Sequence, residues 1–407
     1  MSSDMIFIRG PTLNGWALLY CDSAAYVFVS SSPTTTISST ILYTHSIYLA
    51  MVGRTPTQPQ SFLSIVGRCD NFRIHPVLQE QTGFRTEEVV TFRLDTKPSS
   101  AAIGLLRSVI VEKLLAENAL VPEGQAAFAI FNSNGKTAVS FADWVNTPAK
   151  KTRVMVDLCK KWRDQGLFEG VIGPKKWRNE MYPVYRNPFG KHDSPREEEL
   201  ESLGDANTRN FAFMMERSSC ALFGVVTYGV HLTIYAEDKE GCKIWVPTRS
   251  RTKPTWPGYL DNSVAGGIAA GTGVFETLVK ECMEEASIQE ELIKKYAKSV
   301  GSVTYFFSTD AGWLQPETDV YERYLYEVRI PQGVDFQPKP LDGEVESFEL
   351  LPLSEVTHRM RTGLFKPNCA VVLLDFMIRH GYITPDNEPD FLEITTRIHG
   401  RYDYEHW

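Results

Sequence analysis

One segment constrains the fold of this chain more than any other. Gly266, Gly267, Gly271 and Gly273 come directly before a run with the apolar spacing of an amphipathic helix over 274–286. A glycine loop that opens a helix leaves backbone N–H groups uncovered near the positive end of the helix dipole, where phosphate oxygens are held favourably. The segment therefore predicts a phosphate-binding turn followed by a helix.

The same helix carries three carboxylates. Glu281 precedes Glu284 and Glu285 by three and four positions, so all three can lie along one edge of the helix. Like charges so placed repel each other, and hard oxygen ligands of this kind suit Mg²⁺ or Mn²⁺ that bridges substrate phosphates. A solvated acidic helix face is the commonest fate of such a run, but the glycine loop ahead of it favours a metal site.

Length and composition indicate a soluble protein with more than one core. A chain of 407 residues is expected to form two domains, and its 43% hydrophobic and 23% charged residues are typical of globular proteins. The net charge of −8 disfavours binding to duplex DNA by phosphate neutralisation. We predict a small-molecule partner, no nucleic acid and no membrane, and the oligomeric state stays open.

The cysteines and the N-terminal region bear on the compartment. The seven cysteines are scattered without a Cys-x-x-Cys pair, which favours a reducing compartment over a disulfide framework or a zinc knuckle. The longest uncharged stretch, residues 23–53, is broken by Pro33 and His45 and is a poor candidate for a spanning helix. The first residues lack a basic region. A cytoplasmic location is predicted, and a mitochondrial one is less favoured.

Shifts in pattern divide the chain. We predict an extension of uncertain order over 1–60, an N-terminal α+β domain over 61–187, a connection over 188–210 and a larger α/β domain over 211–407. Helices are expected over 102–118, 148–165, 274–286 and 370–380. Strands are expected over 126–131, 137–141, 221–226, 231–235, 243–246, 301–307, 321–330 and 346–351.

The glycine loop and the acidic helix resemble the Nudix box. In that box a Gly is followed, after five residues, by Glu and, after seven more, by Arg-Glu-U-x-Glu-Glu-x-Gly-U, where U is bulky and apolar. Anchored on Lys280–Glu285, the sequence keeps Gly266 and the three helix glutamates. It departs from the pattern at three positions, Thr272, Lys280 and Ser287. In typical members the first Glu of the box pairs with the Arg and braces the loop against the helix, and Thr272 removes that pair. Glu276 lies four residues before Lys280, and an ion pair between them, worth about 0.2–0.5 kcal/mol, would partly replace it.

The resemblance extends to a narrower group, the Nudix enzymes of fungi and plants identified as thiamine-pyrophosphokinase-related. It rests on Glu216-Arg217, on 228–231 and on Ala265-Gly266-Gly267, and residues 61–187 resemble the extra N-terminal domain of this group. The resemblance implies an α/β/α sandwich with a mixed sheet over 211–407. It also implies a metal-dependent pyrophosphatase that converts thiamine diphosphate and its damaged oxo and oxy analogues to monophosphates.

The resemblance further implies roles for single residues. Glu281, Glu284 and Glu285 fall on the metal ligands, with Glu281 as ligand or base. A further catalytic carboxylate usually comes from a distant loop, and Glu344 is our candidate, although Glu346 is equally near. An ordinary acidic turn is the alternative for both.

Five residues are candidates for substrate binding. Gly266 and Gly267 supply the loop, Arg249 and Lys253 are placed to reach terminal phosphate oxygens, and Trp256 (or Trp313) to stack on a heteroaromatic ring. Surface cations and packing tryptophans are the alternatives.

Three functions stay open on the sequence alone. The first is hydrolysis of thiamine-type diphosphates. The second is hydrolysis of another nucleoside diphosphate derivative, such as ADP-ribose or a sugar nucleotide, because the box does not fix specificity. The third is a catalytically inactive ligand sensor, which the three departures from the box favour and the intact glutamates oppose.

Overall fold

The computed structural model describes residues 18–21, 24–27, 59–74, 88–97, 99–133, 135–204, 209–319 and 324–400. The chain divides into two compact units, residues 1–56 and 57–407. In the first unit, strands β1 (Leu18–Cys21) and β2 (Ala24–Val27) form an antiparallel hairpin. Of the extension predicted over 1–60, residues 59 and 60 are described within the second unit, and the remainder outside the hairpin strands lies outside the described residues.

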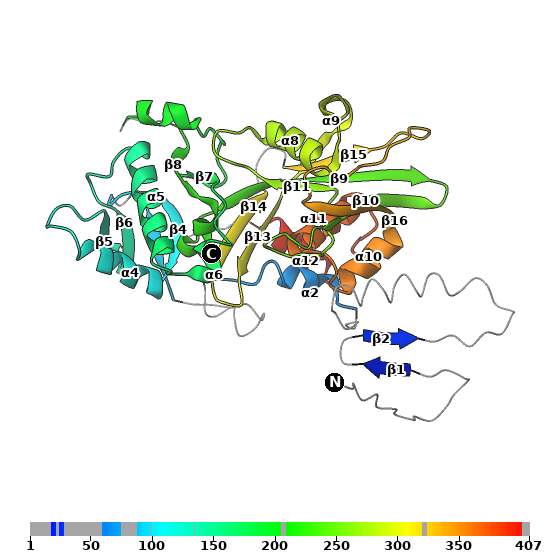
Figure 1. Cartoon of the computed structure of the whole chain (residues 1–407), viewed down its shortest axis with the longest axis horizontal. Helices are drawn as coiled ribbons and strands as arrows, with labels where there is room; N and C mark the ends of the chain where they lie inside the picture. Colours follow the sequence, from blue (N-terminus) through cyan, green and yellow to red (C-terminus); the bar gives the residue numbers. More distant parts are fainter. Residues whose placement is uncertain are drawn as a thin grey trace, which may run out of the picture. The chain divides into compact units, whose positions relative to one another are not determined.

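A small mixed sheet in the second unit has the strand order β4-β3-β6-β5 (Figure 1). Helices α4 and α5 follow strands β4 and β6 along the chain. The bounds of these elements are β3 Val89–Arg93, β4 Ala102–Arg107, α4 Ser108–Asn118, β5 Phe128–Ser133, β6 Lys136–Phe141 and α5 Pro148–Asp164. The strands predicted over 126–131 and 137–141 and the helix predicted over 148–165 are confirmed within a few residues.

The predicted helix over 102–118 is wrong in its first third, because residues 102–107 form strand β4. They pair with β3, and the pairing buries Ile103, Leu105 and Leu106. Gly104 also allows this strand to pack closely against its neighbour, because a Cβ there would lie 2.3 Å from the carbonyl oxygen of Phe223. Tertiary pairing therefore overrides the helical spacing of this run.

A separate two-stranded sheet follows the small mixed sheet along the chain. β7 (Met181–Tyr185) pairs antiparallel with β8 (Phe211–Glu216), and the predicted connection over 188–210 is the excursion between them. The other elements here are short, namely α6 Glu169–Ile172, η1 Glu197–Ser202, η2 Arg217–Ser219 and α7 Cys220–Phe223. The predicted division into domains at 187 and 211 stays a prediction.

The strand predicted over 221–226 is wrong, since its first residues form helix α7. The helix ends at Gly224, whose φ of +54° is a left-handed conformation that glycine adopts without a Cβ penalty. A Cβ at Gly224 would also lie 2.5 Å from the carbonyl oxygen of Leu105. Helix and turn therefore follow from a close approach to β4.

The large sheet is built around β9, which pairs antiparallel with β10 and β11 and parallel with β14 and β15. Five of its strands lie in the order β12-β15-β9-β10-β16. Strands β11 and β14 also pair with β9, and β13 pairs with β14. The strands are β9 Thr227–Asp238, β10 Gly241–Arg249, β11 Val264–Gly267, β12 Lys298–Gly301, β13 Val303–Ser308, β14 Leu314–Asp319, β15 Leu325–Arg329 and β16 Val345–Pro352. The first three residues of the strand predicted over 321–330, residues 321–323, lie outside the described residues.

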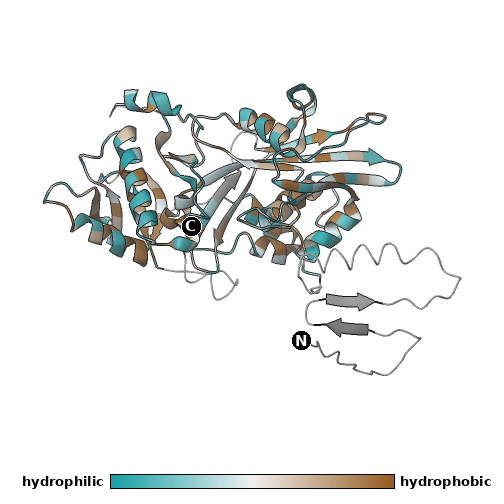
Figure 2. Ribbon diagram, in the orientation of Figure 1, coloured by the Kyte–Doolittle hydropathy of each residue, from teal (hydrophilic) through white to brown (hydrophobic). Residues whose placement is uncertain are grey.

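Helices cover both faces of the large sheet (Figure 1). Helices α8 and α9 lie on one side, and α2, α10, α11 and α12 lie on the other. Their bounds are α2 Phe62–Gly67, α8 Val274–Ala286, α9 Glu290–Tyr296, α10 Leu353–Arg361, α11 Pro367–Arg379 and α12 Phe391–Ile398. Figure 2 shows hydrophilic and hydrophobic residues alternating along α5 and α8, as expected for helices with one buried face. The predicted α/β sandwich with a mixed sheet is confirmed.

Candidate active site

Helix α8 has the bounds that the sequence predicts, and local contacts explain both ends. At its start, the Gly273 N–H donates to the Glu276 carboxylate at 3.2 Å. Glu276 therefore caps the helix, and Lys280 instead lies 3.5 Å from Glu284. At its end, Ser287 stands at φ +56°, the left-handed conformation that the glycine of the Nudix pattern adopts more easily.

Strand β11 brings the predicted glycines against α8. A Cβ on Gly266 would lie 2.2 Å from Cδ of Glu281, so only glycine allows this carboxylate to approach the strand. One residue earlier, the Ala265 N–H donates to Oε2 of Glu285 at 3.1 Å. Backbone and helix together hold two of the three predicted glutamates at β11.

Burial perturbs these two carboxylates. Desolvation raises the pKa of Glu281 to about 7, and the negative charge of Glu284 adds to the effect. Desolvation also raises the pKa of Glu285 to about 8, with a further contribution from Asp261. Glu284 differs from both, because its side chain is 46% exposed. The helix therefore directs two glutamates inward and one toward solvent.

Lys253 and the acidic turn lie at the same place. The Lys253 ammonium is 3.9 Å from Oε1 of Glu285 and forms a close ion pair with Glu344. The turn is fixed to the C-terminal end of α8, where the Asp342 N–H donates to the Glu284 carbonyl at 3.2 Å. Glu346 lies beside Arg251 instead. Of the two candidates in this turn, Glu344 is the one linked to Glu285, through Lys253.

Arg249 and Trp256 form a supported loop. The guanidinium of Arg249 is ion-paired with buried Asp261 and donates to the carbonyls of Thr255 and Trp256 at 3.0 and 3.2 Å. This arginine therefore supports the loop, and its charge is compensated by Asp261. The phosphate contact predicted for Arg249 stays a prediction. Trp256 has a φ of +52°, an uncommon conformation for a bulky residue that marks local strain.

The donor chemistry of this cluster fits a hard divalent cation. Glu281, Glu284 and Glu285 are oxygen donors, and desolvation gives Glu281 and Glu285 raised pKa values that a cation would lower again. Within the ranges that the structure describes, no three His, Cys, Asp or Glu side chains already stand in an arrangement for a metal ion. Lysine ammonium groups, from Lys253 and Lys280, lie beside the carboxylates.

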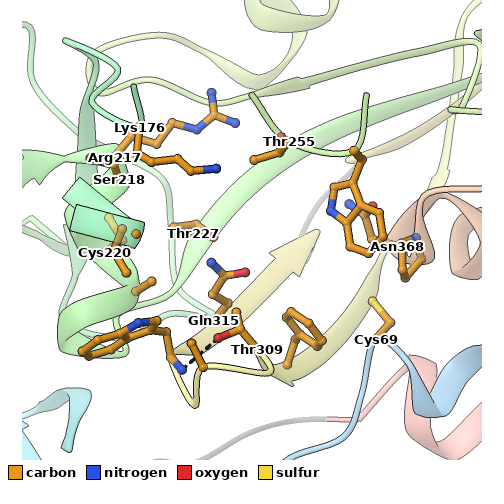
Figure 3. A pocket seen from close by; sticks show the side chains of 18 of the residues that line it. Cys69, Lys176, Arg217, Ser218, Cys220, Thr227, Thr255, Thr309, Gln315 and Asn368 are labelled. Carbon is orange, nitrogen blue, oxygen red and sulfur yellow. Dashed lines mark hydrogen bonds between the residues drawn. The ribbon is translucent and has the colours of Figure 1, made fainter. Parts of the chain in front are cut away.

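The structure contains a cavity of about 550 Å³ (Figure 3), and none of the three glutamates lines it. In Figure 3, Lys176, Arg217 and Ser218 stand on one wall, Cys69 and Asn368 stand on the opposite wall, and Thr227 and Gln315 lie between them. Trp256 and Trp313 also line the cavity, so both predicted stacking tryptophans face it. Trp313 in addition packs edge-on against Phe168.

The cavity and the acidic cluster meet at β11. A Cβ on Gly267 would lie 1.6 Å from Oη of Tyr182 and 2.9 Å from Nη2 of Arg217, and both side chains line the cavity. Gly266, the adjacent residue, contacts Glu281 on the other face of the strand. Gly266 therefore lies against the acidic cluster, and Gly267 lies against side chains that line the cavity.

Sequence reasoning missed the cations of the cavity, among them Lys176, Arg178 and Arg217. No local motif marks them as ligand contacts, since they precede Gly266 by 49 or more positions and the pairing of β7 with β8 brings their segments together. None of the described helices is long and apolar enough to cross a membrane.

Comparison with known proteins identifies the region around α8. Residues 227–369 match the family model of the NUDIX domain. An uncharacterized protein of Saccharomyces cerevisiae, YJR142W, is 40% identical over 249 residues, which are 59% of this chain and 66% of that protein. Arabidopsis thaliana Nudix hydrolase 20, chloroplastic, is 36% identical over 256 residues, which are 62% of this chain and 59% of the plant protein. This chain spans less than two thirds of the length of these relatives.

Proposed function

We propose that this chain, whose residues 227–369 form a NUDIX domain, is a metal-dependent hydrolase of a diphosphate linkage. The observation that carries the proposal is the pair of desolvated carboxylates held against β11, buried Glu285 and Glu281, whose side chain is 15% exposed. Buried carboxylates cost free energy unless a positive charge compensates them, and such perturbed groups cluster at functional sites. The intact pair argues against the inactive sensor.

We propose a separate role for each group of residues in the site. Glu281, Glu284 and Glu285 would hold Mg²⁺ or Mn²⁺, which when bound neutralises diphosphate charge and lowers the pKa of water. Glu281 is proposed as ligand or base: where Glu284 and Glu285 alone hold the ion, its pKa, raised to about 7 in the metal-free protein, suits it to accept a proton from the attacking water near neutral pH. Glu344 is proposed as the further carboxylate, since Lys253 already links it to Glu285.

The proposed substrates are thiamine diphosphate and, preferentially, its damaged oxo and oxy analogues, which the enzyme would clear as monophosphates. Three features support this choice. The cavity has a volume suited to one small molecule, five cationic side chains line it, and Trp256 offers an aromatic surface. Gly266 and Gly267 would let backbone N–H groups approach the phosphates.

We also propose that the protein works in a reducing compartment, the cytoplasm. Six cysteines are free and buried in the part of the chain that the structure describes in side-chain detail. Free buried thiols are typical of proteins that are kept reduced.

Product analysis tests the proposal. Thiamine diphosphate, its oxo and oxy analogues, ADP-ribose and a dinucleotide are incubated with the protein and Mg²⁺ or Mn²⁺, and monophosphates are quantified. The proposal expects turnover of the thiamine-type substrates that a chelator abolishes. Turnover of the nucleotides alone would assign the site to nucleoside diphosphate derivatives. No turnover of any substrate by a folded, metal-loaded sample would contradict the proposal that the protein is a hydrolase.

A further inference from the structure

The cavity is positively charged although the protein is acidic. Five cationic side chains line it against a single carboxylate, Asp310, whereas the whole chain has a net charge of −8. Cations gathered in a concave, partly desolvated place repel each other, and this arrangement favours an anionic ligand. The five are Arg68, Lys176, Arg178, Arg217 and Lys366.

Four of these five cations precede the matched NUDIX region, which begins at residue 227. Arg178 follows α6 and is exposed to the cavity, while its backbone N–H is fixed by the Glu216 carboxylate at 2.8 Å. Arg217 lies over the ring of Tyr182, with its guanidinium carbon 5.0 Å from the ring centroid, and pairs with Glu180. Both arginines are therefore held in position by neighbours outside the NUDIX region.

The same segment also reaches into the NUDIX region. The Lys176 ammonium donates to the Pro254 carbonyl at 3.0 Å, two residues before Trp256. The Arg249 guanidinium donates to the next two carbonyls along the chain, those of Thr255 and Trp256. The loop that carries Trp256 is thus fixed jointly by β10 and by the preceding segment.

The charges predicted from sequence as phosphate contacts are already compensated. Arg249 is paired with Asp261, and Lys253 with Glu344 and Glu285. Burial, and then the positive charges of Arg217 and Arg249, lower the pKa of Arg178, and the carboxylates of Glu180 and Glu216 offset part of this effect. A phosphate group beside Arg178 and Arg217 would relieve that repulsion and gain charge-assisted hydrogen bonds.

We infer that the segment ahead of the NUDIX domain supplies the phosphate-binding cations of the site, Arg178 and Arg217, and so decides which diphosphates the cavity accepts. The ligand class is a small organic diphosphate, with its phosphates at these arginines beside Gly267 and its ring toward Trp256. This inference deepens the proposed function and rests on it for the identity of the ligand.

Equilibrium binding without metal tests the inference separately from hydrolysis. Inorganic pyrophosphate and thiamine diphosphate are titrated by calorimetry into the full chain in the presence of a chelator. The variants are Arg178→Ala and Arg217→Ala, with Arg329→Ala as the matched control because that arginine is 61% exposed on β15 and pairs with Glu237. Circular dichroism verifies that each variant is folded.

We expect both cavity variants to bind both ligands at least about tenfold more weakly, as loss of a charge-assisted hydrogen bond predicts. Arg329→Ala should bind like the wild type. Unchanged affinity in a folded Arg178→Ala protein, or a wild type that binds neither ligand, would overturn the inference. Failure of the proposed function would look different: the wild type would bind pyrophosphate but turn over no diphosphate when metal is added.

Discussion

The two faces of β11 differ in charge and in how the chain builds them. On the α8 face, Glu281 and Glu285 come from one helix that directly follows the glycine loop. On the cavity face, the charges are positive and come from segments as far apart as Arg68 and Lys366. On our proposal, the groups for metal chemistry come from one short segment, whereas the groups that recognise the ligand come together only when the whole unit folds.

The largest expected effect is on the acidic face. Glu285→Gln should lower kcat for diphosphate hydrolysis by at least about 100-fold, because even partners that only support a metal ligand cost 10–100-fold when removed. Metal-free binding of pyrophosphate should persist. Steady-state kinetics and calorimetry measure the two quantities. Glu276→Gln is the control, since Glu276 caps α8 and lies outside the cluster, and a Glu285→Gln protein with full metal-dependent activity would refute the assignment.

The adjacent glycines allow each face to be disturbed separately. Gly266→Ala places a Cβ against Glu281, and Gly267→Ala places one against Tyr182 and Arg217. Either clash should lower the free energy of unfolding by about 1–3 kcal/mol. Gly266→Ala should mainly weaken the response to Mn²⁺, whereas Gly267→Ala should mainly weaken pyrophosphate binding. Identical effects of the two variants on both readouts would mean that the two faces are not distinct.

The pH dependence of stability sharpens the description of the acidic face. Because the pKa of Glu281 is raised to about 7 and that of Glu285 to about 8, the folded protein holds protons at pH values where the unfolded chain has lost them. Without metal, the free energy of unfolding should therefore fall as the pH rises from about 5 to about 8. Urea denaturation of Glu285→Gln should show a smaller fall. The same slope in Glu285→Gln and the wild type would contradict burial of this carboxylate.

The smallest expected effect concerns the aromatic side of the cavity. Trp256→Ala should weaken binding of thiamine diphosphate by about 1 kcal/mol, the size of an aromatic contact, and leave pyrophosphate binding unchanged. Trp144→Ala is a suitable control, because Trp144 is 44% exposed and lies outside the cavity lining. Calorimetry with both ligands measures the difference. Equal loss for both ligands would indicate collapse of the loop and not loss of stacking.

The sequence predicts these two regions unequally for physical reasons. Helix α8 and the approach of Gly266 to Glu281 depend on contacts within a short stretch, which periodicity and glycine placement reveal. The inward direction of Glu285 and the partners of Arg249 depend on β10, β11 and Asp261, and no local pattern marks them. The spacing of residues 102–107 predicts helix instead of strand β4 for the same reason, since the pairing of β4 with β3 is not visible in that spacing.

The central claim is that both faces of β11 serve one ligand, with metal on one side and phosphate-binding arginines on the other. Phosphorus NMR of a bound, non-hydrolysable methylene diphosphate analogue tests this most directly, because Mn²⁺ strongly accelerates relaxation of nearby phosphorus nuclei. We predict that Mn²⁺ broadens the resonances of the bound analogue in the wild type and leaves them sharp in Glu285→Gln, which still binds the analogue. Resonances that stay sharp in the wild type, with analogue and Mn²⁺ both bound, would contradict a shared site.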